Sequence, residues 1–158
     1  MNFPKRIYTV KEVELARKLI KNGYKHRLKM KGNKNFKQKT KEAIRLVKKA
    51  GYYNFLRTYI RCIEEINGLT QLREADATIW ANKYAVKNPV DFASLLIQKA
   101  NHMKDYIEGK LYFGGEAEER SVKKRIEFLK VLKKKTQDEK VKKECERLLK
   151  MWSDSTLL

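Results

Sequence analysis

The chain has 158 residues, enough for one domain with a substantial core, and its 42% hydrophobic content excludes a disordered tail. No apolar run approaches the length of about 18 residues that a membrane span needs, and no apolar stretch follows the first charges, so neither a span nor a secretory signal is expected. The formal net charge of +19 argues against a neutral surface and favours an acidic partner.

The positive charge is concentrated at the front of the chain. Residues 1–62 contain 19 Lys or Arg and three acids, a net charge of +16. Residues 63–158 contain 19 Lys or Arg and 16 acids, a net charge of +3. Like charges repel one another unless an anion neutralises them, so this asymmetry is a stronger sign of an acidic partner than the total charge.

The first predicted elements are a helix and a basic segment. Thr9 and Glu12 have the spacing of a capping box and predict a helix over residues 10–22, which Gly23 either ends or interrupts. Residues 24–31 then alternate between Tyr, His, Leu or Met and Lys or Arg, which is the period of a strand. Because no convincing partner strand follows, we interpret them as an extended basic arm or as a continuation of the first helix.

Three further helices are predicted before residue 87. The first begins near Phe36 and ends near residue 50, with Phe36, Thr40, Ala43, Ile44 and Val47 facing the core. The second covers residues 52–67, where apolar residues recur at helical spacing. The third covers residues 70–86 and is apolar on two faces, which predicts a central place in a bundle.

Capping signals mark the remaining helices. Asn88 followed by Pro89 predicts a helix that runs to about Tyr112. A Gly pair separates it from a helix over residues 117–135, and Thr136 with Glu139 forms a second capping box before the last helix.

Because every predicted element except the basic arm is a helix, we expect an all-α protein. The links between the helices are short, so consecutive helices should pack antiparallel. We expect a single domain, residues 1–158, built as a compact bundle of about six to seven antiparallel helices with a basic N-terminal helix or arm. Its parts are that helix and arm (1–33), a helical core (34–112) and a C-terminal helical hairpin (116–152). A helical-repeat array is the lesser alternative, because the expected Trp, Gly, Tyr and Ala positions do not recur.

The sequence gives no sign of an active site. It contains none of the common nucleotide-binding, serine-hydrolase or zinc-protease motifs. His26 lies in the basic arm, His102 with Asp105 fits a structural helix pair, and the acids at 116–119 suit the positive end of a helix. Cys62 and Cys145 are isolated and fit packed, reduced thiols in a cytoplasmic protein better than a disulfide. We therefore expect no enzyme activity, no metal and no cofactor.

The basic region is the candidate binding site. On the helix that contains Phe36, five cations fall within an arc of roughly 80° and form a stripe about 21 Å long, a length over which nucleic acids present several phosphates. They are Lys34, Lys37, Lys41, Arg45 and Lys48. Cations of the arm could follow the backbone, and two tyrosines near them could stack on bases. The candidate nucleic-acid-binding residues are Tyr24, Lys25, Arg27, Lys29, Lys31, Lys34, Lys37, Lys41, Arg45, Lys48, Tyr53, Arg57 and Arg61.

The expected function is that of a non-enzymatic accessory protein that binds DNA or RNA through phosphates with little sequence specificity. The Lys-rich and Glu-rich composition also fits a thermophile, and a mobile genetic element is a suitable source. The alternative is a helical interaction module whose basic end docks an acidic protein, with the C-terminal hairpin as a second contact or as the surface of a homo-oligomer. Trp152, Leu157 and Leu158 suit such a contact, and a frayed tail is the other interpretation of these residues. A merely solvated basic face is the third interpretation.

Overall fold

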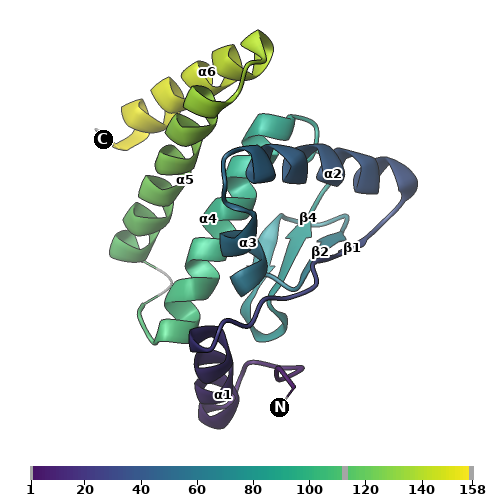
Figure 1. Cartoon of the computed structure of the whole chain (residues 1–158), viewed down its shortest axis with the longest axis vertical. Helices are drawn as coiled ribbons and strands as arrows, with labels where there is room; N and C mark the ends of the chain where they lie inside the picture. The colour runs from purple at the N-terminus through teal and green to yellow at the C-terminus, as the bar shows by residue number, and fades with distance from the viewer. Residues whose placement is uncertain (1, 112–113, 157–158) are drawn as a thin grey trace.

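The computed structural model describes residues 2–111 and 114–156, and over these residues six α-helices pack with a four-stranded mixed sheet (Figure 1). The protein is therefore α/β, and the expectation of an all-α bundle is wrong. Strands account for only 9% of the chain and helices for 63%, which is why the sequence patterns predicted helices alone.

The sheet is built from four very short strands. They are β1 (Lys29–Lys31), β2 (Cys62–Glu65), β3 (Gln71–Arg73) and β4 (Thr78–Ala81), in the spatial order β1-β2-β4-β3. Neighbours β1, β2 and β4 are parallel, while β3 is antiparallel to β4. The segment at 24–31 is therefore extended, and its partner is a strand that the sequence patterns did not reveal.

One face of the sheet forms part of the hydrophobic core. Met30, Ile63, Ile79 and Leu72 lie side by side across the four strands, and Ile63 and Ile79 are fully buried. Because side chains alternate along a strand, the residues on either side of this row point to the opposite face. That opposite face carries mainly polar and charged residues.

Three helices belong to the front of the chain. They are α1 (Val10–Lys21), α2 (Lys34–Lys49) and α3 (Tyr53–Tyr59). The predicted capping box of α1 is present, since Thr9 accepts from the backbone N–H of Glu12 and Glu12 accepts from that of Thr9. The core-facing residues predicted for α2 are all buried, which confirms the orientation expected for that helix.

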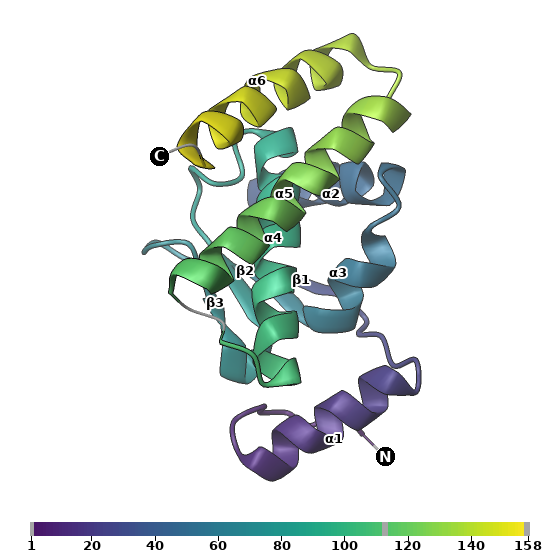
Figure 2. The same ribbon diagram turned by 90° about the vertical axis from the view of Figure 1, so that its left-hand side faces the viewer.

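The rear helices form the other layers of the molecule. They are α4 (Pro89–Glu108), α5 (Gly115–Lys135) and α6 (Glu139–Thr156). In Figures 1 and 2, α4 lies between the sheet and the hairpin formed by α5 and α6, so it is covered on several sides and twelve of its residues are buried. Over the described residues, no helix is both long enough and apolar enough to cross a lipid bilayer.

The helix predicted over 52–67 is wrong in its second half. α3 ends at Tyr59, Ile60 has extended backbone angles, and β2 follows. Ile60 and Ile63 are both fully buried although neither is helical. Apolar spacing that fits a helix thus continues through a turn into a strand, where β-branched residues are favoured.

The helix predicted over 70–86 does not exist. That segment forms β3, a short 3-10 turn η1 (Glu74–Asp76) and β4, and the central helix of the molecule is α4. Ala77 between η1 and β4 adopts a left-handed conformation with φ of 51°, which closes the turn. Each strand here contributes only one or two core side chains, too few for a period of two to be recognised.

Two predicted helix ends also differ. α4 ends at Glu108 because Gly109 takes a left-handed conformation, whereas the predicted end at Tyr112 lies outside the described residues. The second capping box is absent: the Asp138 carboxylate accepts from the backbone N–H of Lys140, and Thr136 is instead the C-cap of α5.

Candidate nucleic-acid interface

The α2 stripe, defined as Lys34, Lys37, Lys41, Arg45 and Lys48, is exposed along its whole length. Its residues recur every three or four positions, so they share one side of the helix. The buried residues of α2, such as Phe36 and Val47, occupy the neighbouring side and attach the helix to the core. The helix is therefore anchored while it presents five cations to solvent.

A tight turn between β1 and the start of α2 positions the stripe. The Asn33 side chain caps α2 by accepting from the backbone N–H of Phe36 at 2.8 Å, and Glu65 on β2 accepts from the backbone N–H of Asn33 at 2.9 Å. Gly32 has a φ of +155°, and a Cβ atom there would lie 2.7 Å from the Phe36 ring and 2.8 Å from the Glu65 Cβ. Glycine is thus required where α2 leaves the sheet.

Within the described part of the chain, the cations of the front form no ion pairs. All nine ion pairs found over residues 2–111 and 114–156 join residues between Asp91 and Arg147. None involves a Lys or Arg of residues 1–62. Of the few acids there, Glu12 is used to cap α1. The charge asymmetry in the sequence therefore persists in the folded protein.

A groove of about 380 Å³ lies beside the stripe, between α2 and β1. Its apolar lining includes Leu28 and Met30, and its charged lining comes from the C-terminal half of the α2 stripe. Such a groove can hold a polyanion along its cations while excluding some water from the contact. Its lining residues are Leu28, Met30, Lys41, Ile44, Arg45, Lys48 and Tyr53.

Tyr53 lines this groove, and two cations lie close to its ring. The Lys48 Nζ is 4.6 Å from the centre of its ring, and the Arg57 guanidinium carbon is 5.4 Å from it. Arg57 is fixed in turn by donating to the Asn54 side chain at 3.0 Å. Of the two predicted stacking residues, Tyr53 therefore lies among the predicted phosphate-binding cations.

The arm cations are divided between two surfaces. Lys25 and Arg27 are exposed on the extended segment before β1. Lys29 and Lys31 belong to β1 but point away from the groove, because Met30 between them faces the core side of the sheet. The structure therefore does not bring all predicted site residues onto one continuous face with the α2 stripe.

Two other predicted site residues are engaged in packing at the N-terminus. Arg61 donates to the backbone carbonyls of Lys5 at 2.7 Å and Pro4 at 2.5 Å, and its guanidinium lies over the Phe3 ring. The Tyr24 ring stacks on the same Phe3 ring with centroids 4.8 Å apart. Tyr24 is thus occupied with an intramolecular partner.

His26 completes this aromatic cluster and is only 2% exposed. Its ring packs edge-on against Phe3 and Tyr24. Burial lowers its pKa to about 4, and the nearby Arg61 charge acts in the same direction. Burial is the larger of the two causes.

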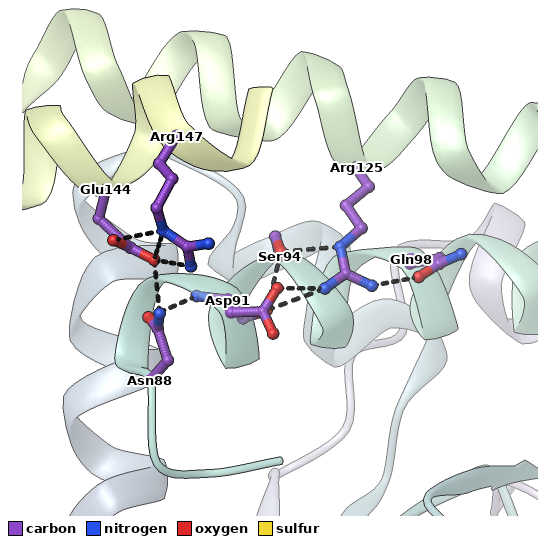
Figure 3. A network of polar contacts seen from close by, with 7 residues as sticks. All are labelled: Asn88, Asp91, Ser94, Gln98, Arg125, Glu144 and Arg147. Carbon is purple, nitrogen blue, oxygen red and sulfur yellow. Dashed lines mark hydrogen bonds and ion pairs between the residues drawn. The ribbon is translucent and has the colours of Figure 1, made fainter. Parts of the chain in front are cut away.

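A polar network between α4 and the α5–α6 hairpin was not predicted (Figure 3). Arg125 on α5 is buried and donates to Asp91 at 2.6 Å, Ser94 at 2.9 Å and Gln98 at 2.6 Å, all on α4. Asp91 balances its charge. The network satisfies the polar side chains that α4 places against the hairpin, because these side chains accept hydrogen bonds from Arg125.

His102 is paired differently from the sequence-based interpretation. Its Nε2 lies 3.7 Å from Glu118 on α5, whereas Asp105 pairs with Arg120 at 3.1 Å. Burial and the nearby Lys99 charge lower the pKa of His102, although Glu118 opposes them. In the described part of the chain no three His, Cys, Asp or Glu side chains gather closely enough to hold a metal ion.

The sequence also missed two residues on the outer sheet face, Arg73 and Trp80. The Arg73 guanidinium carbon lies 4.4 Å from the centre of the Trp80 ring. The alternation in Gln71–Arg73, polar-apolar-polar, was the available signal, but three residues were too few to outweigh the helical interpretation.

The interface is therefore an anchored cationic helix beside a groove with one flanked tyrosine. Such an arrangement has the charge that phosphate contacts require, and it has no cluster of Asn, Gln or Arg side chains of the kind that reads bases. The chain matches no known protein family, no curated protein and no solved structure.

Proposed function

We propose that the protein binds nucleic acid through phosphate contacts of the α2 stripe and the adjoining groove, with little sequence preference. The observation that carries this proposal is the row of five exposed cations, anchored on the core and without ion-pair partners in the described structure. A polyanion would neutralise them and release its own condensed counterions, which is the main source of non-specific binding energy.

The groove favours a chain-like anion over a compact one. Lys41, Arg45 and Lys48 follow one another along its side, and Tyr53 also lines it, close to Lys48 and to one further cation, Arg57. Successive phosphates of a nucleic-acid backbone match such a row. The protein would act as a non-enzymatic accessory factor. The unpaired, buried Cys62 and Cys145 fit a reducing compartment such as the cytoplasm.

Charge reversal on α2 tests the proposal. Changing Lys37, Lys41, Arg45 and Lys48 together to Glu should abolish binding of labelled DNA and RNA and leave the helical circular dichroism signal unchanged, because all four side chains are exposed. The control reverses four exposed lysines of the rear with the same change in net charge. It contains Lys110→Glu, Lys123→Glu, Lys143→Glu and Lys150→Glu.

The control variant should retain most of the binding. Equal losses in the two variants would show that only the total charge matters and would overturn the assignment to α2. Binding of an acidic protein with no binding of nucleic acid would replace the proposed function by a protein-docking one.

A further inference from the structure

The outer face of the sheet carries two rows of side chains opposite the core row. The strand register places Lys31, Glu64, Trp80 and Gln71 in one row. The same register places Lys29, Cys62, Thr78 and Arg73 in the other. Lys29, Lys31, Gln71 and Arg73 are exposed, so this face is open at both edges of the sheet.

A concave site of about 300 Å³ lies on this face. Trp80 contributes an aromatic wall, and the Arg73 guanidinium lies over its ring. Its lining contains three cations, Lys29, Lys31 and Arg61, and two carboxylates, so its net charge is positive. The remaining lining residues are Cys62, Glu64, Asp76 and Thr78.

We propose that this face, the Trp80 site, binds an unpaired base of a single-stranded nucleic acid while Lys29 and Lys31 contact the neighbouring phosphates. The proposal rests on the proposed function and names its substrate class. A base would stack on the Trp80 ring or on the Arg73 guanidinium above it, as both are flat surfaces that bases accept. Bases within a duplex are already stacked and cannot reach the ring.

The position of the site relative to the α2 stripe supports one strand crossing both surfaces. Lys31 is the last residue of β1, and only Gly32 and Asn33 separate it from Lys34, the first residue of the stripe. The Trp80 site and the α2 stripe therefore lie on opposite sides of the edge strand β1 and come close together at the turn formed by Gly32 and Asn33. Single-stranded nucleic acid is flexible enough to follow such a bend, whereas a short duplex is stiff.

Tryptophan fluorescence tests this inference, because the chain contains only Trp80 and Trp152. Trp152 lies on α6 over Arg125, so Trp152→Phe leaves Trp80 as the single reporter. We expect single-stranded oligothymidine to quench this emission. A duplex of equal length should bind without quenching, and so should an abasic oligonucleotide, which has phosphates but no bases.

Substitution of Trp80 provides a second readout. Trp80→Ala should weaken binding of oligothymidine about 10- to 100-fold and leave duplex binding unchanged, whereas Trp80→Phe should retain part of the affinity. Thermal unfolding of both variants checks that they fold, and the abasic oligonucleotide gives the same test without a mutation of Trp80.

The possible outcomes separate the two proposals. Binding of duplex and single strand without quenching, and with no effect of Trp80→Ala, would overturn the Trp80 site and leave the α2 function standing. Failure of the unmodified protein to bind either nucleic acid would overturn both. Quenching by the abasic oligonucleotide equal to that by oligothymidine would show that no base stacks there.

Discussion

The front of the molecule, residues 1–62, and the rear, residues 63–158, contain the same number of Lys and Arg residues but differ in their acids. In the rear, cations pair with carboxylates, from exposed helix pairs such as Lys123 with Glu119 to the pair of the buried Arg125 with the half-buried Asp91. In the described front they have no such partners and line a helix, a groove and a sheet face. The comparison teaches that the local supply of acids, rather than the number of cations, distinguishes the ion-paired surface of the rear from the surface of the front that we propose for binding.

Removing the acid that pairs with the buried Arg125 should have the largest effect on stability. Asp91→Asn leaves the Arg125 charge, whose side chain is only 6% exposed, without its carboxylate. We expect a loss of about 3 kcal/mol in the free energy of unfolding, measured with urea. The control, Arg147→Met, breaks an exposed pair with Glu144 and should cost less than about 1 kcal/mol. Equal costs would contradict the distinction between buried and exposed pairs.

Acidification should lower the folding stability of the protein, because His26 is buried in its neutral form. Its pKa is about 4 in the folded protein and 6.5 as an ordinary value, so the unfolded chain binds more protons between these pH values. The contribution of the neutral His26 to the free energy of unfolding is therefore fully present above about pH 6.5. It falls by about 3 kcal/mol as the pH decreases toward 4. Urea unfolding at several pH values measures this loss.

A His26→Phe variant is the control for that pH dependence. It keeps an aromatic ring beside Phe3 and Tyr24 and removes the titrating group. The remaining dependence should be smaller and should come partly from His102, whose pKa is also lowered. An unchanged pH profile in this variant would contradict the role given to His26.

A methyl group at Gly32 should disturb the turn that positions α2. The Cβ of Gly32→Ala would overlap with the Phe36 side chain and with Glu65, and we expect a loss of about 2 kcal/mol in thermal unfolding. Gly23→Ala is the matched control, since Gly23 also has a positive φ but has no atom within 4 Å of the added Cβ. Its cost should be about 1 kcal/mol, from the backbone alone. A larger cost at Gly23 than at Gly32 would be incompatible with this packing.

The smallest expected effect is that of a single Lys→Glu substitution on the free energy of unfolding, and its sign should differ between the front and the rear. Lys37→Glu in the front places an acid four residues before Lys41 and should stabilise the free protein by about 0.3 kcal/mol at low salt. Lys123→Glu in the rear breaks the pair with Glu119, four residues earlier, and should destabilise it by a similar amount. Thermal unfolding in low and high salt checks both, since salt should suppress the differences. The same sign in both variants would contradict the comparison.

Local signals predicted the helices that carry their own start and stop residues. Thr9 with Glu12, and Asn88 with Pro89, begin helices where expected, and the periodic residues of α2 gave its buried face and hence the direction of its cations. Each of these features depends on neighbours within one or two turns, which a single sequence contains.

The sheet could not be predicted because its signals are nonlocal. Lys29–Lys31 showed alternation, but its partner Cys62–Glu65 follows a helix at a spacing that continues the helical pattern. Pairing between segments more than 30 residues apart leaves no mark in strands of three or four residues. The Trp80 site depends on that pairing and was missed for the same reason, whereas the α2 stripe depends only on one helix.

The most direct measurement of the central claim is the affinity of the unmodified protein for a short DNA duplex at several salt concentrations. If the α2 stripe and its surroundings engage five to eight phosphates, the logarithm of the association constant should fall with the logarithm of salt at a slope of roughly −4 to −7. A slope near zero, or no binding at about 0.1 M salt, would contradict the account.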